Sequence, residues 1–113
     1  MDIQKYINEY IDSCILHGCA TEEGNHKLAN KSYKKIITNY NNLKRLGDIG
    51  LTALVKLLDH PNLSVQLWSY SHLLPFNENL AKNKLRKLSL ETGIVSLNAE
   101  ITLEEWENNQ LEI

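Results

Sequence analysis

Residues 54–75 read LVKLLDHPNLSVQLWSYSHLLP, two apolar segments on either side of a short polar turn. In both segments, apolar and aromatic residues recur every three or four positions, which is the period of an α-helix. Pro61 disfavours helical geometry at His60, and Asp and Asn side chains bond readily to the local backbone in turns. These residues therefore predict two helices that meet at residues 59–62, the second of which ends just before Pro75.

The same helical period extends outward in both directions, and nothing alternates with period two for long enough to predict a strand. Gly47 and Gly93 stand where helices are expected to end, and Asp48 is expected to cap the third helix. That helix is short and rich enough in apolar residues to be central and to bury more than one face. The predicted helices cover residues 2–22, 25–46, 49–58, 65–74, 77–91 and 96–109. The predicted fold class is all-α, with about six helices in antiparallel pairs that form a HEAT-like or α-solenoid-like right-handed bundle.

The length of 113 residues suits one core, so residues 1–113 are expected to form a single HEAT-like helical domain. Hydrophobic residues make up 42% of the chain and charged residues 23%, which is typical of a globular protein.

Cys14 and Cys19 are expected on different faces of the first helix and therefore reduced. The amino-terminal segment lacks the pattern of a signal peptide, and no run of 18 apolar residues occurs. These features predict a cytoplasmic protein with no membrane partner.

The charges are distributed unevenly among the predicted helices. Residues 1–23 hold five acidic residues and one lysine, whereas residues 27–45 hold six basic residues and no acidic one. Residues 82–87 hold four basic residues, and residues 91–113 hold six glutamates and no basic residue. One interpretation is that each acidic helix lies antiparallel to a basic one and gains a little stability from ion pairs.

Two other interpretations assign these charges to a partner. The glutamates of the last helix could attract a basic protein. Lys31, Lys34 and Lys35 could instead contact phosphates, but the lysines at positions 27, 31 and 34 recur at helical spacing without an interleaved glycine or aromatic platform. The net charge of −2 also disfavours nucleic acid as a partner, because duplex binding relies on an excess of basic residues. The expected partner is therefore another protein and not a nucleic acid.

The sequence contains no motif for catalysis or for binding a metal or cofactor. The four histidines fall in four different segments, and neither HExxH nor Cys-x-x-Cys occurs. A phosphate-binding glycine loop and a nucleophile elbow are also missing. The chain is predicted not to be an enzyme and to use no metal, cofactor or small-molecule substrate. The alternative, an enzyme acting on nucleotides or nucleic acid, requires Lys44, Asp59, His60 and His72 to meet in one buried site.

The candidate partner-binding residues are large aromatic side chains and the glutamates of the last helix. Tryptophan and tyrosine provide large anchors at protein interfaces, although core packing is the competing role for each tryptophan. Solvated glutamates attract basic partners. The candidates are Trp68, Tyr70, Glu100, Glu104, Glu105 and Trp106.

The segment Leu54–Val65, followed by Leu67-Trp68 and by residues 72–75, resembles a HEAT repeat. A HEAT repeat consists of two helices joined at a short turn, with Asp and Val near the junction. With residues 99–100 and 102–106 added, the chain resembles a family of small bacterial helical proteins catalogued as domain of unknown function two-thousand-and-nineteen. The resemblance spans most of the chain and implies an all-helical fold.

The chain departs from the pattern of that family in the second helix of the repeat. Where the pattern has a basic residue followed by alanines, this chain has Gln66, Ser69 and Ser71. These substitutions predict a more polar and less tightly packed helix face.

The resemblance also implies a tendency to bind other proteins, because stacked helix pairs form extended surfaces. Small, acidic, single-domain bacterial proteins of this HEAT-like type resemble immunity proteins, which are encoded beside secreted toxins and block them by tight binding. The expected function is neutralisation of a cognate toxin, with a basic toxin domain as the partner. The alternative is a general adaptor or scaffold that holds a peptide or a second copy of itself.

Overall fold

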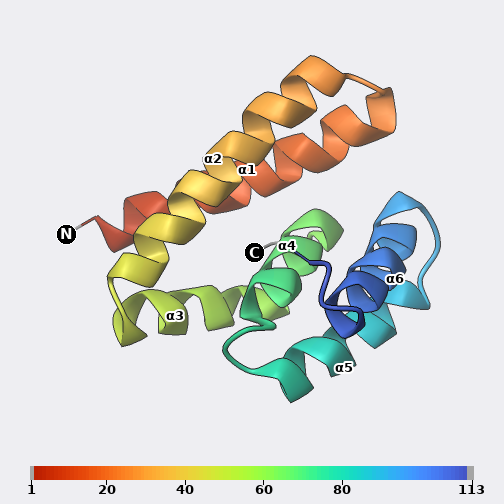
Figure 1. Ribbon diagram of the computed structural model, residues 1–113. Helices are drawn as coiled ribbons and strands as arrows, with labels where there is room; N and C mark the ends of the chain where they lie inside the picture. Colours follow the sequence, from red (N-terminus) through yellow and green to blue (C-terminus); the bar gives the residue numbers. More distant parts are fainter. Residues whose placement is uncertain (1, 112–113) are drawn as a thin grey trace.

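The computed structural model describes residues 2–111, and Figure 1 shows how they are arranged. Within this range the chain forms six α-helices, one short 3₁₀ helix and no strand, which confirms the all-α fold. The elements are α1 (Ile3–Glu23), α2 (His26–Arg45), α3 (Asp48–Val55), η1 (Lys56–Asp59), α4 (Leu63–Leu73), α5 (Glu78–Ser89) and α6 (Ile94–Glu107). Each predicted helix is present, and the differences lie at the helix ends.

A glycine and an asparagine form the tight turn between α1 and α2. Gly24 has a positive φ of 71°, which glycine adopts without steric cost. The backbone N–H of Gly24 donates to the carbonyl of Thr21, and that of Asn25 donates to the carbonyl of Ala20. The Asn25 side chain accepts from the backbone N–H of Leu28 at 3.1 Å and so caps α2. The turn lets α2 run back along α1, as Figure 1 shows.

The third helix differs from the prediction in its cap and in its burial. Gly47, with a φ of 67°, is the N-cap of α3, and the Asp48 side chain makes no capping hydrogen bond because Asp48 already lies in the first turn. Of the predicted helix, residues 49–58, the structure places the last three in η1. Leu54, Leu57 and Leu58 are buried on one face, but Ile49 and Val55 are exposed. The prediction that this helix buries more than one face was therefore wrong. Apolar density alone does not reveal how many neighbours surround a helix.

The connection between α5 and α6 also differs from the prediction. α5 ends at Ser89 instead of Glu91, and Gly93, with a φ of 100°, is the N-cap of α6 and does not terminate α5. α6 consequently begins at Ile94 and ends at Glu107. A glycine with positive φ fits before a helix as well as after one, and the periodicity of the flanking residues does not distinguish the two positions.

Two helix pairs flank a central helix. α1 and α2 form an antiparallel hairpin, and α5 packs against α6 (Figure 1). α4 contacts α1, α3, α5 and α6, so α4 occupies the centre that the sequence predicted for α3. No helix within residues 2–111 combines the length and the apolar character needed to cross a membrane.

The buried apolar core draws side chains from every helix and surrounds α4. Cys14 belongs to this core, Cys19 is exposed, and both are free thiols, as predicted. The clustered core residues are Ile7, Tyr10, Cys14, Ile36, Tyr40, Leu43, Leu54, Leu57, Leu58, Val65, Tyr70, Leu73, Leu74, Ala81, Leu85, Leu88 and Ala99.

Ser69 and Ser71 of α4 are buried, contrary to the loosely packed face that the sequence predicted. Ser69 Oγ donates to the carbonyl of Gln66 at 3.2 Å, and Ser71 Oγ donates to the carbonyl of Leu67 at 2.6 Å. Their hydroxyl groups are therefore satisfied within α4 itself. Small side chains with satisfied hydroxyls let the neighbouring helices approach α4 without burying an unpaired donor.

The charged blocks lie as one interpretation of the sequence predicted. Glu9 and Asp12 of the acidic α1 share a shallow surface depression with Lys34 and Lys35 of the basic α2. The basic α5 likewise packs against the acidic α6. Ion pairs within 4.0 Å occur only in the α5–α6 pair, however, among residues 2–111. The α1–α2 pairing therefore depends on apolar packing rather than on direct ion pairs.

Candidate functional site

A groove lies where α1, α4 and α6 meet, and its volume is about 270 Å³. We call it the three-helix groove. This volume is close to the lower end of the range for small-molecule sites, so the groove suits one large side chain. The residues that line it are His17, Gly18, Thr21, Glu22, Ser64, Leu67, Trp68, Ser71, Ile94, Val95, Asn98, Ile101 and Thr102.

Trp68 is the largest side chain in the groove, and three other rings pack against its indole. The ring of His17 packs edge-on against Trp68, with 5.2 Å between the ring centroids. Tyr33 and His72 approach Trp68 to 5.8 and 5.7 Å. Burial lowers the pKa of His17, so its imidazole is neutral near pH 7. The groove therefore contains an ordered aromatic surface without positive charge.

Gly18 allows α1 to approach α4 beside Trp68. A Cβ atom at this position would overlap Oγ of Ser64 and lie 3.0 Å from the Ser64 Cβ. A larger residue would require the Ser64 hydroxyl to rotate away and its Cβ to shift slightly. Gly18 therefore marks the place where α1 comes close to the Ser64 side chain of α4.

The α6 wall of the groove continues onto an exposed apolar surface. Ile94, Leu97 and Ile101 follow one another at helical spacing and are 41%, 56% and 41% exposed. We call these three residues the α6 stripe. Two of them, Ile94 and Ile101, also line the groove. Contiguous exposed apolar residues on a folded protein are typical of an interaction surface.

Carboxylates border the groove on two sides. Glu22 of α1 lines it directly. Glu105 follows Ile101 by four residues and Thr102 by three, so it projects from the face of α6 that lines the groove. Neither lysine nor arginine is among the lining residues. The groove consequently presents negative charge beside an aromatic and aliphatic surface.

Trp68 lines the three-helix groove, and the three candidate glutamates lie on α6, the helix that forms one of its walls. Glu100 and Glu104 follow Leu97 by three and seven residues, so they lie beside the α6 stripe, and both are exposed. None of the three glutamates forms an ion pair within residues 2–111. Trp68 therefore lines the three-helix groove and Glu105 lies at its border, whereas Glu104 and Glu100 lie beside the α6 stripe, farther round the helix from the groove.

The other two candidates are occupied elsewhere. Tyr70 is buried, and its hydroxyl donates to the carbonyl of Leu58 at 3.2 Å. This corrects the prediction that Tyr70 faces a partner, because its side chain belongs to the core. Trp106 packs against the core, and its indole N–H donates to Oε2 of Glu78 at 2.6 Å. We therefore assign Trp106 to the contact between α6 and α5.

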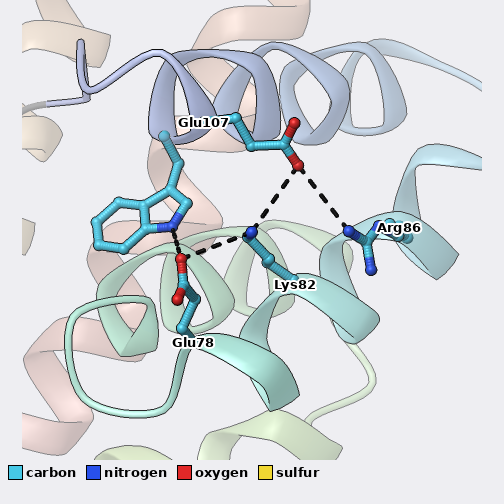
Figure 2. Close-up of polar contacts among 5 residues, drawn as sticks. Glu78, Lys82, Arg86 and Glu107 are labelled. Carbon is cyan, nitrogen blue, oxygen red and sulfur yellow. Dashed lines mark hydrogen bonds and ion pairs between the residues drawn. The ribbon is translucent and has the colours of Figure 1, made fainter.

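Figure 2 shows the polar contacts that join α5 and α6. Glu78 accepts from the Trp106 indole and lies 3.6 Å from Nζ of Lys82. Lys82 and Arg86 also approach Oε1 of Glu107, at 4.0 and 3.9 Å. These distances are long and the side chains are partly exposed, so each ion pair adds little stability. The network engages Glu78 and Glu107 and leaves the glutamates near the groove free.

Replacing Trp106 by phenylalanine is expected to raise the pKa of Glu78. The hydrogen bond from the Trp106 indole is the main cause of the lowered pKa of this carboxyl, and Lys82 is the next. An NMR titration of the Glu78 side-chain carboxyl would measure the change. Lys82→Met should produce a smaller rise, whereas an unchanged Glu78 pKa in Trp106→Phe would contradict the assigned hydrogen bond.

A buried histidine lies in the core next to the aromatic surface of the groove. The hydroxyl of Tyr10 lies 2.7 Å from Nδ1 of His72, and the Tyr40 ring stacks on the imidazole at a centroid distance of 3.8 Å. Nε2 of His72 has no hydrogen-bond partner within residues 2–111. Burial, with a smaller contribution from Lys44, lowers the pKa of His72 to about 3. His72 is therefore a neutral core residue at physiological pH.

The residues of the enzyme alternative do not line the groove. His72 is in the core, and Nζ of Lys44 lies over the Tyr40 ring, 4.5 Å from the ring centroid. Nδ1 of His60 accepts from the backbone N–H of Asn62 at 3.0 Å, and Asp59 is exposed at the end of η1. Among the described residues, 2–111, no group of three or more His, Cys, Asp or Glu side chains is placed to hold a metal ion.

Comparison with known proteins relates this chain to a solved structure. No protein-family model matches the sequence, and neither does any curated protein. The crystal structure of the protein RPA1889 from Rhodopseudomonas palustris CGA009 is similar, with a TM-score of 0.88 and 17% sequence identity. The similarity covers 100% of this chain and 94% of that one. The two proteins share a fold. Function does not follow from a shared fold, and the resemblance to the bacterial family stays a prediction.

Several groove residues were not predicted from the sequence. They include polar residues of α1 and α6, such as Glu22 and Asn98, whose spacing carries no motif. One signal was present, because Leu97 and Ile101 lie outside the apolar stripe of Ala99, Leu103 and Trp106 that packs on the core. A second apolar stripe on an amphipathic helix indicates a second contact surface.

Proposed function

We propose that this protein acts by binding another protein and catalyses no reaction. In this proposal it is a cytoplasmic immunity protein with a HEAT-like bundle, and it neutralises a cognate bacterial toxin through direct contact with a basic domain. The observation that carries the proposal is the uncovered α6 stripe, which borders three glutamates that lack an ion pair within residues 2–111.

The composition of this surface supports a protein partner. Protein interfaces combine an apolar, aromatic centre with a polar rim, and tryptophan is enriched among the residues that contribute most to affinity. Here the α6 stripe and Trp68 provide the centre, and Glu100, Glu104 and Glu105 provide the rim. Free carboxylates attract a basic surface over a distance and so increase the association rate.

The proposal is tested by capturing the partner from the native host with the tagged protein, followed by mass spectrometry. One stoichiometric toxin-like partner with a basic domain supports the immunity function. Several weak partners, or capture of this protein alone, would favour the adaptor or self-associating scaffold instead. If a toxin-like protein is captured together with weaker partners, the next measurement is which of them binds the purified chain at a 1:1 ratio.

Changing Glu100, Glu104 and Glu105 together to lysine is expected to slow association with the captured partner by about tenfold or more at low salt. The salt dependence of the association rate should weaken as well, because the attraction has been removed. Stopped-flow or surface-based kinetics at several ionic strengths would measure both effects.

A control with the same change in net charge places the lysines on α1 and at Asp2, the residue just before it. Asp2, Glu9 and Glu23 are exposed and lie outside the three-helix groove. Changing these three to lysine should alter the association rate much less than the α6 variant does. Equal slowing by both triple variants would show that net charge, and not the α6 surface, controls association.

A further inference from the structure

We propose that the three-helix groove is a recognition pocket for a single arginine side chain of the partner protein. This inference rests on the proposed function and specifies the chemistry of the group that enters the groove. It is carried by three features: the hydrogen-bonding state of the hydroxyl groups that line the groove, the Trp68 ring, and the charge at the border.

Three of the four hydroxyl groups that line the groove, all but that of Ser64, are arranged to accept hydrogen bonds. Thr21 Oγ1 donates to the carbonyl of His17 at 2.8 Å, and Thr102 Oγ1 donates to the carbonyl of Asn98 at 2.8 Å. Ser71 Oγ likewise donates to a carbonyl of its own helix at 2.6 Å. Each hydroxyl proton is thereby used within a helix, and only the oxygen lone pairs are left for a ligand. These oxygens come from α1, α4 and α6, so they surround the groove on three sides.

A group with several donors and no acceptor fits such a lining. The arginine guanidinium carries five N–H donors and no acceptor, and its charge is permanent. The lysine ammonium has three donors around one point, which matches less well with acceptors that are spread over three helices. Glu22 adds a carboxylate to the lining, and no basic residue competes with an incoming cation.

The remaining surface of the groove suits the apolar part of an arginine side chain. A guanidinium stacks favourably on the face of tryptophan, and Trp68 lines the groove. Leu67, Val95 and Ile101 line it as well and can pack against the methylene groups. The α6 stripe continues outward from the groove, so the polypeptide that carries the arginine would contact Leu97.

The experiment uses the whole protein and small probes whose ends resemble a peptide chain. N-acetyl-arginine N-methylamide is titrated into the ¹⁵N-labelled protein, and N-acetyl-citrulline N-methylamide is the neutral control of nearly identical shape. We expect saturable NMR shifts at Gly18, Thr21, Asn98 and the Trp68 indole N–H. The citrulline probe should bind about tenfold more weakly, because it lacks the charge.

Two matched variants test the lining residues. Glu22→Gln should weaken binding of the arginine probe by roughly threefold, since it removes a partly solvated carboxylate. Glu23→Gln removes the neighbouring exposed carboxylate, which does not line the groove, and should leave binding unchanged. Trp68→Leu should weaken binding by about fivefold, through loss of the cation–π contact. Circular dichroism of each variant confirms that it is folded before titration.

Other outcomes overturn the inference. Equal binding of the arginine and citrulline probes, shifts confined to residues outside the groove, or no saturable shift would each exclude an arginine pocket. Binding of propylguanidinium without binding of the peptide-like probe would assign the groove to a free guanidino compound. If no probe binds while partner capture still depends on Glu104 and Glu105, this inference fails and the proposed function stands. If the probe binds and no protein is captured, both the proposed function and the partner-derived arginine are excluded.

Discussion

Replacing Gly50 by alanine is expected to destabilise the protein by about 3 kcal/mol or more. Gly50 is buried where α3 packs against α2. A Cβ atom there would overlap the carbonyl oxygen of Leu43 and lie 2.7 Å from its carbonyl carbon. The obstacle is backbone within α2, so it cannot rotate away as the end of a side chain could. The α2–α3 junction would have to open.

Thermal and chemical denaturation of the Gly50→Ala variant would measure this effect. A loss of this size should lower the Tm by about 10 °C for a chain of this length. Thr52→Ala is the matched control, because Thr52 is exposed on the same helix and alanine favours helix formation. A Gly50→Ala variant within about 1 kcal/mol of the wild type would show that the two helices are not in close contact.

Acidification is expected to destabilise the protein through His72. The pKa of this histidine falls from its usual 6.5 to about 3 in the folded chain, mainly because the imidazole is buried. Below about pH 6.5 the unfolded chain therefore binds a proton that the folded chain does not. The stability due to neutral His72 is complete above this pH and is lost progressively as the pH falls towards 3. Between about pH 6.5 and about pH 4.5 the expected loss is about 2 kcal/mol.

The contribution of His72 is separated from that of other groups by comparing pH slopes. His72→Gln should lower stability at neutral pH but reduce the dependence of unfolding free energy on pH in this range. His26→Gln, which changes a histidine exposed at the start of α2, should leave the slope as it is in the wild type. Urea unfolding at several pH values gives the slopes. An unchanged slope in His72→Gln would mean that His72 does not cause the acid sensitivity.

The helices were predictable because their signals are local. Helical periodicity located all six, and the turn residues around Pro61 located the connection into α4. The uncertain positions were those where one residue fits two roles, as Gly93 does at the start of α6. Asp48 is a similar case, since an acidic residue is favourable both as a cap and in the first turn.

The candidate site was predictable only in part, because it depends on which side of each helix faces a neighbour. Trp68 and Tyr70 are two residues apart in α4, and one lines the groove while the other is buried. α4 is apolar on most sides, so its sequence does not reveal which aromatic residue faces the groove. The glutamates of α6 were predictable from charge alone. Their position beside a groove requires α1 and α4, which are distant in the sequence.

The three walls of the groove come from residues 17–22, 64–71 and 94–102, so the groove exists only while both ends of the chain are folded together. An occupant that bridges these segments binds the folded state and has no equivalent site in the unfolded one. It would act as a reversible cross-link between the beginning and the end of the polypeptide. Its binding energy would add to the stability of the entire molecule, so a bound partner would protect this protein from degradation as well as being held by it.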